Sequence, residues 1–361
     1  MNKTKQNKLS PQTRSDFITY GIVLVAFLVL QPMKMAGLLS SSLSGLLVPI
    51  CAYVVMAISL NLTVGVLGEL SLGHAGFMSV GAFSGVVAAA MMESTVSSAP
   101  LRLFLAIVIG GLIAGVAGFV IGIPVLRLRG DYLAIVTLAF GEIIKNIINC
   151  LYVGFDSQGL HIGMQDSVSL GMEQGGRVLI NGPVGAVGVA KLSSFTAGFL
   201  LILFSLMVVL NMKRSRTGRA IMAVRDNRIA AESVGIPITR YKMTAFITSA
   251  ILAGMAGVLF AMNYTSLIAS KFDFNTSILV LVFVVLGGMG NIRGSIIATV
   301  VLYILPEMLR GLDDFRMLIY AIVLIAVMLI TNSDRVRQLH DKFLAKRQSQ
   351  REKAEKGGRT A

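Results

Sequence analysis

The feature that most constrains the fold of this chain is a series of apolar runs, each close to 20 residues long, that recurs along the sequence. A helix of about 20 apolar residues matches the hydrocarbon core of a bilayer. Only 14% of the 361 residues are charged, against roughly 25% in soluble domains. Because only helices and closed barrels satisfy their backbone hydrogen bonds inside lipid, the sequence predicts an all-α integral membrane protein, a polytopic helical bundle.

Gly, Pro, Asn and charged residues separate the apolar runs and mark the ends of the predicted spans. About ten transmembrane helices are expected, near 17–37, 43–65, 71–92, 102–125, 131–152, 196–212, 243–263, 275–289, 295–310 and 315–331. These spans make up a predicted transmembrane domain over 17–331. The stretch from Gly65 to Gly76 is rich in Gly and polar residues, so a re-entrant turn is an alternative there and would change the number of spans.

The net charge of +14 is concentrated in three places, which are the N-terminal tail at 1–16, the loop at 213–242 and the C-terminal tail at 332–361. Positive residues collect on the cytoplasmic side of membrane proteins, so both termini and the 213–242 loop are predicted to be cytoplasmic. The Gly-rich polar loop at 153–195 then lies outside. Because the charge flanks spans, it favours contact with membrane lipid over nucleic acid, although the 332–361 tail can equally stay solvated.

The 213–242 loop consists largely of helix-forming residues and ends at Gly235 and Pro237, which predicts a helix at the cytoplasmic surface. Ala223, Ala230 and Ala231 stand at positions expected to pack closely. One interpretation is a basic interfacial helix held by anionic lipid.

Polar residues inside the spans are candidates for a translocation pathway, because such groups are costly in lipid. Ser71 and His74 place a hydroxyl and an imidazole at the mouth of a span, where they can line a cavity or only hydrogen-bond a neighbouring helix. In the fifth span Glu142, Lys145 and Asn146, followed by Asn149, share one helical face. An ion pair within the helix and a stripe that lines the pathway are both compatible with this spacing.

Small residues and cysteines have structural interpretations. Glycines at three- and four-residue spacing predict close helix packing, and they are Gly81, Gly85, Gly111, Gly115, Gly118 and Gly122. Cys51 and Cys150 lie in apolar runs without metal-ligand spacing and are expected to be packing residues.

Several motifs in the same order resemble permeases of the branched-chain amino acid family of ABC importers. They are Asn61 to Gly65, Ser71 to Phe77, Leu128 to Ala134, Thr137 to Glu142, Ala253 to Gly257 and Gly287 to Gly294. The similarity covers roughly 45–330, and the N-terminal extension with an extra span is similar to the M-type subunit. In this resemblance the 213–242 loop is the segment that couples to the ATPase, with Gly218, Arg219, Ala223, Arg225, Asp226, Asn227, Ala230, Ala231 and Gly235 as its candidate residues.

The resemblance implies a permease subunit of an ATP-driven importer for branched-chain or similar small amino acids, in a bacterial inner membrane. Its implied partners are a homologous permease subunit, two cytoplasmic ATPase subunits and an extracytoplasmic substrate-binding protein. No GxxxxGK[ST] motif occurs in the chain, so ATP is expected to bind to separate subunits and no cofactor is expected in this one. Without HExxH or GxSxG motifs, an enzyme is not predicted.

Three alternatives remain. The same architecture can carry urea or short amides, since permeases for urea share these motifs. An ion-coupled secondary transporter would need acidic residues at mid-membrane, for which only Glu142 qualifies. A membrane enzyme would need His74 and Glu142 to converge with a third polar group.

Overall fold

The computed structural model describes residues 11–128, 130–156, 159–166, 168, 170–172, 176–309, 318–319, 321–325 and 329. The chain divides into two compact units, Met1–Val301 and Leu302–Ala361. The predicted tail at 332–361 and most of the predicted span at 315–331 lie outside the described residues, as does most of the tail at 1–16.

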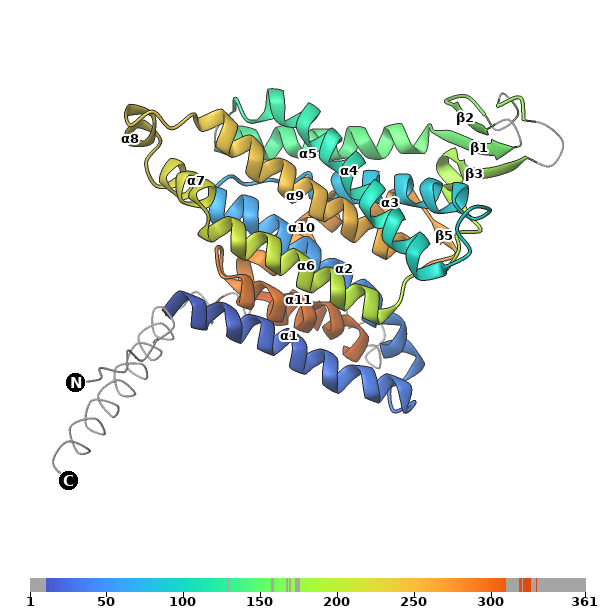
Figure 1. Ribbon diagram of the computed structural model, residues 1–361, viewed down its shortest axis with the longest axis horizontal. Coiled ribbons are helices and arrows are strands. Elements are labelled where there is room, and N and C mark those ends of the chain that lie inside the picture. Colours follow the sequence, from blue (N-terminus) through green and yellow to red (C-terminus); the bar gives the residue numbers. More distant parts are fainter. Residues whose placement is uncertain are drawn as a thin grey trace, which may run out of the picture. The chain divides into compact units, whose positions relative to one another are not determined.

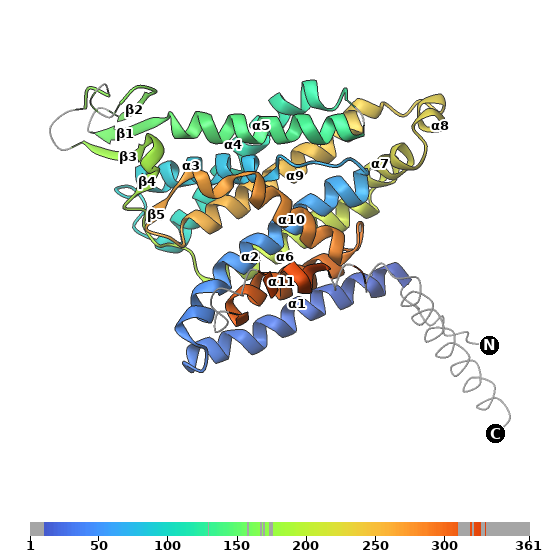
Figure 2. The ribbon, with the colours of Figure 1, turned by 180° about the vertical axis from the view of Figure 1, so that it is seen from behind.

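The described chain is largely helical (Figures 1 and 2). Its α-helices are α1 (Pro11–Met35), α2 (Ser41–Asn61), α3 (His74–Met91), α4 (Ala99–Val125), α5 (Asp131–Asn149), α6 (Phe195–Arg214), α7 (Arg216–Asp226), α8 (Arg228–Ser233), α9 (Ile238–Ala261), α10 (Phe274–Gly287) and α11 (Ile292–Met308).

Among the described residues, six helices are long and apolar enough to cross a membrane, and they lie in α1, α2, α3, α4, α6 and α9. The helix α5 is not one of these six, and α10 is a shorter apolar helix of 14 residues. The prediction of a multi-span helical protein is therefore confirmed, whereas the number of about ten spans is not.

Side-chain caps mark several helix starts. The Ser40 hydroxyl accepts a hydrogen bond from the Leu43 nitrogen at the start of α2, and Ser194 does the same for Ala197 at the start of α6. Asp273 caps α10 through the Thr276 nitrogen. Such caps satisfy backbone donors that have no partner within the helix.

The core of the first unit is α9, which packs against α2, α3 and α4 (Figure 1). Glycines allow these close approaches. A Cβ at Gly81 would overlap the backbone of Gly254, and a Cβ at Gly257 would overlap the Met78 carbonyl. Gly111 and Gly115 likewise face α9 side chains. These contacts confirm the predicted role of the glycine series in helix packing.

The uncertain stretch from Gly65 to Gly76 is a break between two helices. The α2 helix continues into a π-helix, η1 (Leu62–Leu67), and ends at Gly68, which has a φ of +79°. The chain is then non-helical until α3 begins at His74, so the predicted spans 43–65 and 71–92 are separate helices.

The all-α prediction is wrong in one region, because the loop predicted at 153–195 contains a sheet. The strands are β1 (Tyr152–Asp156), β2 (Gly159–Gly163), β3 (Arg177–Asn181), β4 (Ala186–Val187) and β5 (Ser266–Leu267). They pair antiparallel in the order β2-β1-β3-β4-β5. Two short 3-10 helices, η2 (Gly182–Val184) and η3 (Ala269–Phe272), flank the paired strands.

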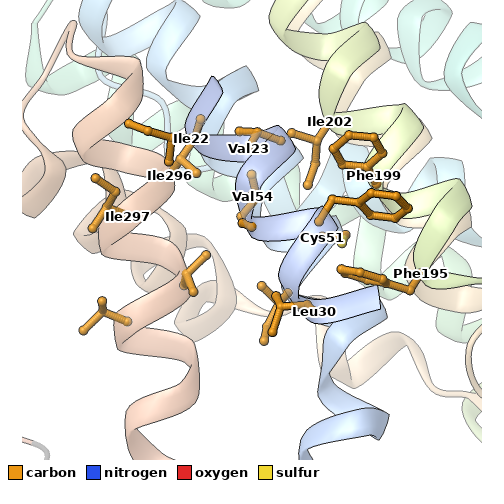
Figure 3. A pocket seen from close by; sticks show the side chains of 15 residues that line it. Ile22, Val23, Leu30, Cys51, Val54, Phe195, Phe199, Ile202, Ile296 and Ile297 are labelled. Carbon is orange, nitrogen blue, oxygen red and sulfur yellow. The ribbon is translucent and has the colours of Figure 1, made fainter. Parts of the chain in front are cut away.

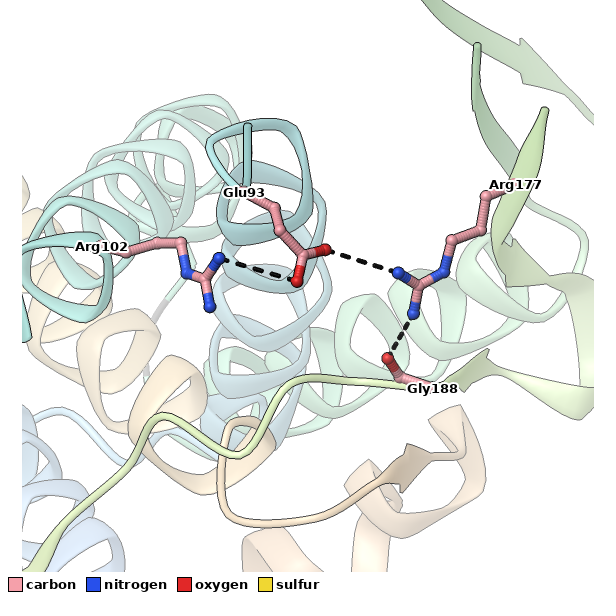
Figure 4. Close-up of polar contacts among 4 residues, drawn as sticks. All are labelled: Glu93, Arg102, Arg177 and Gly188. Carbon is pink, nitrogen blue, oxygen red and sulfur yellow. Dashed lines mark hydrogen bonds and ion pairs between the residues drawn. The ribbon is translucent and has the colours of Figure 1, made fainter. Parts of the chain in front are cut away.

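One carboxylate ties the sheet to the neighbouring helices. Glu93, after α3, lies between Arg102 of α4 and Arg177 of β3, at 3.7 and 3.5 Å (Figure 4). Arg177 also donates to the Gly188 carbonyl at 2.6 Å. The cluster therefore joins the α3–α4 turn to the sheet and to the segment before α6.

The first helix lies at the edge of the first unit, with only 11% of its span buried against 72% for α2. Phe27 stacks on Phe195 and Phe199 of α6, and Asp16 pairs with Arg214. An apolar cavity of about 220 Å³ remains between α1, α2, α6 and α11 (Figure 3).

Candidate coupling and translocation sites

The cytoplasmic segment predicted at 213–242 folds into two short helices whose ends are set by its own side chains. Ser215 caps α7 by accepting from the Gly218 nitrogen at 3.1 Å, and Asn227 caps α8 through the Ala230 nitrogen at 3.0 Å. Gly218 has no room for a side chain beside the Met212 carbonyl. Gly235, with a φ of +80°, ends the segment before α9.

A small apolar cluster holds the two helices to α9. Val224 of α7, Ala231 of α8 and Ile238 of α9 are buried together, with Ile236 packed against them. The expectation of close packing is confirmed for Ala231 but is wrong for Ala223 and Ala230, which are exposed. The helical period alone does not predict which alanines face inward, because Asn227 divides the segment into two helices.

Arg225 points toward the membrane-spanning part of the chain. Its Nη1 donates to the Gly65 carbonyl at 2.9 Å, while Nε and Nη2 donate to Asp226 Oδ1 at 2.9 and 2.8 Å. Asp226 thus orients the guanidinium. Arg219, by contrast, is exposed and bonds the Arg214 carbonyl of its own segment.

Sequence reasoning did not select two exposed apolar residues on this segment. Ile229 is 81% exposed and Val234 is 74% exposed. Both lie in a segment rich in charge. They are therefore candidates for contact with a protein partner. The sequence signal that could have identified them is the presence of Ile229 and Val234 among polar residues.

The ion pair between Lys242 of α9 and Glu69, after η1, was also missed. Lys242 is 5% exposed and Glu69 lies in the break between α2 and α3. The two residues are distant in the sequence, so spacing could not have paired them.

Ser71 and His74 are buried and bonded within the chain. His74 Nδ1 lies 3.3 Å from the Ser71 hydroxyl, and Nε2 lies 2.7 Å from the Ser249 hydroxyl of α9. Ser249 donates its proton to the Ser59 carbonyl at 2.6 Å. The hydrogen bonds therefore assign the proton of a neutral His74 to Nε2, with Nδ1 accepting from Ser71. This geometry favours the hydrogen-bonding alternative for His74.

In the polar stripe of α5, Glu142 and Lys145 are bonded, whereas Asn146 is exposed. Glu142 pairs with Lys145, as the spacing allows, and also accepts from the Phe274 nitrogen of α10 at 3.1 Å. Asn146 is exposed, and its side chain bonds no other described residue. Among the described contacts, none joins Glu142 or Asn146 to Ser71 or His74, so the four candidate pathway residues form two separate groups.

Residues 42–331 match the family described as branched-chain amino acid transport system / permease component. The chain belongs to this permease family. The predicted M-type resemblance is also confirmed, because the permease is similar to proteins named LivM. The family and the apolar helices together indicate a multi-pass membrane protein that is a transport component and not an enzyme.

The permease is 34% identical over 288 residues to the high-affinity branched-chain amino acid transport system permease protein LivM of Salmonella typhimurium, covering 77% of this chain and 66% of the relative. The LivM protein of Escherichia coli is equally similar, at 34% over 287 residues with the same coverage. The match thus spans just under two thirds of these relatives.

A sugar permease is also similar to this permease. The L-arabinose ABC transporter permease protein AraH of Azospirillum brasilense is 29% identical over 278 residues, covering 76% of this chain and 73% of the relative. No solved structure matches the chain.

Proposed function

We propose that this permease is the membrane-spanning subunit of an ATP-driven importer for branched-chain or similar small amino acids in a bacterial inner membrane. The single observation that carries the proposal is the similarity to two LivM proteins over 77% of the chain. The substrate class comes from the printed names of those relatives.

Two cytoplasmic ATPase subunits would drive transport through the α7–α8 segment. The support is the exposure of Ile229 and Val234 at α8, since an apolar tip on a charged helix pair fits a groove on a soluble partner. Ala223 and Ala230 of the same segment are also exposed. Arg219, Asp226 and Asn227 are exposed on the same segment and would form a polar rim. ATP would bind to the separate ATPase subunits.

A homologous permease subunit would complete the translocation path against α5. The Asn146 side chain has no bonded partner in the part of the chain that the structure describes, and it lies beside the exposed Ile143 and Ile147 on a helix of a membrane protein. Because a polar group facing lipid is costly, a facing subunit or an aqueous path explains it better than lipid does. Glu142 and Asn146 would then line the path, and Ser71 and His74 would shape it from the buried side.

In the proposed orientation both termini and the α7–α8 segment are cytoplasmic, and the sheet lies outside. The sheet is open, with β2 and β5 as its outer strands, and it needs water or protein around it because open strand edges do not occur in lipid. An extracytoplasmic substrate-binding protein would deliver substrate on this side.

A sugar importer is the second candidate, because a relative named for L-arabinose matches 76% of this chain. The test is uptake of labelled leucine, valine, arabinose and urea into vesicles that contain this subunit, with and without its ATPase, permease and binding-protein partners. Leucine uptake that needs ATP and every component supports the proposal. Arabinose or urea uptake under the same conditions would change the substrate, and uptake by this chain alone would overturn the ATP-driven mechanism.

Docking on α8 is tested by co-purification of the ATPase with the double variant Ile229→Asp and Val234→Asp. We expect the yield of bound ATPase to fall sharply, because charges replace the apolar tip. Thr239→Asp, an exposed change in α9 just after the segment, is the matched control. Equal ATPase recovery from all three proteins would sink the docking proposal.

A further inference from the structure

The π-helical end of α2 touches the turn between α10 and α11 through a close contact of two glycine backbones. A Cβ at Gly65 would overlap the backbone nitrogen of Gly290. Asn61, one turn earlier, accepts from the same Gly290 nitrogen at 3.1 Å and donates to the Ser295 hydroxyl of α11 at 2.7 Å. We call these four residues, Asn61, Gly65, Gly290 and Ser295, the glycine junction.

Two cations, one just before α7 and one in its last turn, bond to the glycine junction. Lys213, in the last turn of α6 just before α7, donates from Nζ to the Gly290 carbonyl at 3.3 Å. Arg225, in the last turn of α7, donates to the Gly65 carbonyl at 2.9 Å. Figure 2 shows the end of α2 beside α7, in agreement with the contacts between α7 and η1.

The local structure is built to admit Arg225. Gly68 leaves the space that the arginine Cγ fills, because a Cβ there would overlap it. The Gly65 carbonyl lies in the last turn of the α2–η1 helix, where carbonyls lack partners within the helix and attract cations. A π-helix at such a place is uncommon, and π-helical turns occur frequently at functional sites.

The apolar cluster of Val224, Ala231 and Ile238 attaches the same segment to α9. The segment around α7 is thus attached to the membrane-spanning helices by two different kinds of contact. The apolar contact tolerates small sliding, whereas the two cationic hydrogen bonds fix α7 to defined carbonyls on α2 and on the α10–α11 turn.

We propose that Lys213 and Arg225 are positioning residues that transmit a displacement of α7 to the cytoplasmic ends of α2, α10 and α11 through the glycine junction. The proposal rests on the proposed function only for the source of the force, which is the ATPase bound to α7–α8. Arg225 then acts inward on the membrane-spanning helices, and the exposed tip of α8 acts outward on the ATPase.

The test compares the double variant Lys213→Gln with Arg225→Gln against Arg127→Gln with Arg240→Gln, which removes the same charge. Arg127 and Arg240 are exposed and lie outside α7 and α8. The complete transporter in vesicles is measured for ATPase binding, ATP hydrolysis and labelled leucine uptake. Hydrogen exchange of peptides covering 62–73 and 287–294 is measured without ATP.

We expect the double variant to keep its ATPase and its hydrolysis, while uptake per ATP falls about tenfold, within the range typical of coupling between sites. Exchange should accelerate in both peptides, and the control should match wild type in every assay. Arg225→Lys alone should recover part of the uptake per ATP, because a lysine can still reach the Gly65 carbonyl. If the double variant does not fold, Arg225→Lys still tests the proposal, because its uptake per ATP should be lower than that of wild type.

Two outcomes overturn the proposal. Unchanged uptake per ATP with unchanged exchange would leave Lys213 and Arg225 without a positioning role. Loss of ATPase binding in the double variant alone would place the two residues in the docking surface instead. If wild type shows no ATP-driven leucine uptake, the proposed function fails, and the exchange measurement alone then decides whether the cations hold the junction.

Discussion

The carboxylate of Glu142 accepts a hydrogen bond of 3.1 Å from the backbone nitrogen of Phe274, so a charged residue of α5 caps the first turn of α10. The same carboxylate pairs with Lys145 one turn along its own helix. A residue selected from the sequence for the translocation path therefore also joins two helices.

Replacing Glu142 should lower stability in a graded way. Glu142→Gln keeps an oxygen that can accept from Phe274 but loses the ion pair, whereas Glu142→Ala loses both. We expect the unfolding temperature to fall slightly for Gln and further for Ala, where the loss is about 1 kcal/mol. Asn146→Ala, on the same stripe, should leave the unfolding temperature unchanged. A loss of uptake in Asn146→Ala without a loss of stability would support a pathway role for Asn146.

The bonds around His74 predict a stability effect at Ser249. Ser249→Ala removes the acceptor of His74 Nε2 and the donor to the Ser59 carbonyl, which are both buried. The expected loss is about 1–3 kcal/mol, because buried polar groups lose their partners. Thr248→Ala, which removes only a bond to the Thr244 carbonyl of the same helix, is the control for the unfolding temperature. Equal values for both variants would refute the structural role.

Asp273 predicts a loss of stability in acid. Burial acts to raise the pKa of Asp273, but hydrogen bonds from Thr276 and Asn275 and the charge of Lys145 outweigh it, so the pKa is lowered. With a pKa lower when folded than when unfolded, the contribution is present above the ordinary aspartate pKa and disappears as pH falls through the folded value.

Scanning calorimetry in detergent, from pH 7 to about one unit below the ordinary aspartate range, measures this contribution. Asp273→Asn keeps a side chain that can cap α10, so its unfolding temperature should depend less on pH than that of wild type. Parallel pH curves for the two proteins would contradict the assignment.

The tight crossing of α3 and α9 predicts that Gly257 cannot accept a methyl group. Gly257→Ala would press its Cβ into the Met78 carbonyl, so we expect a destabilisation of about 1–3 kcal/mol. Gly45→Ala, where nothing lies within 4 Å of the added carbon, is the matched control. Purified yield and unfolding temperature in detergent measure the difference.

The two cysteines predict a labelling pattern that also reports orientation. Cys150, after α5, is exposed, and Cys51 in α2 is buried. A membrane-impermeant maleimide added to spheroplasts should label wild type and Cys51→Ser but not Cys150→Ser. If Cys150 reacts only after the membrane is opened, the proposed orientation is inverted.

Long spans could be predicted from the sequence because each is a local pattern. The span predicted at 102–125 is α4 (Ala99–Val125), and the one at 196–212 is α6 (Phe195–Arg214). The sheet could not be predicted, because its strands have five residues or fewer and β5 follows β4 only after several helices. Such short runs carry too little periodicity.

The candidate coupling segment was predicted as a helix from its composition, but which of its side chains point inward and which outward was not predicted. Arg225 turns inward because Gly65 offers a carbonyl and Gly68 leaves space, and both lie far away in the sequence. Asn227 divides the segment into two helices, which exposes Ile229 and Val234. These facts depend on tertiary contacts that spacing does not encode.

The pairing of β4 with β5 has a consequence for biosynthesis. Ala186 and Val187 meet Leu267 and Ser266, which leave the ribosome only after α6, α7, α8 and α9 have been made. Until then β4 presents an unpaired edge, and an unpaired edge invites pairing with another chain. Closure of the sheet therefore cannot precede the synthesis of α9, and a nascent chain that stalls before Ser266 exposes an edge that another chain can pair with.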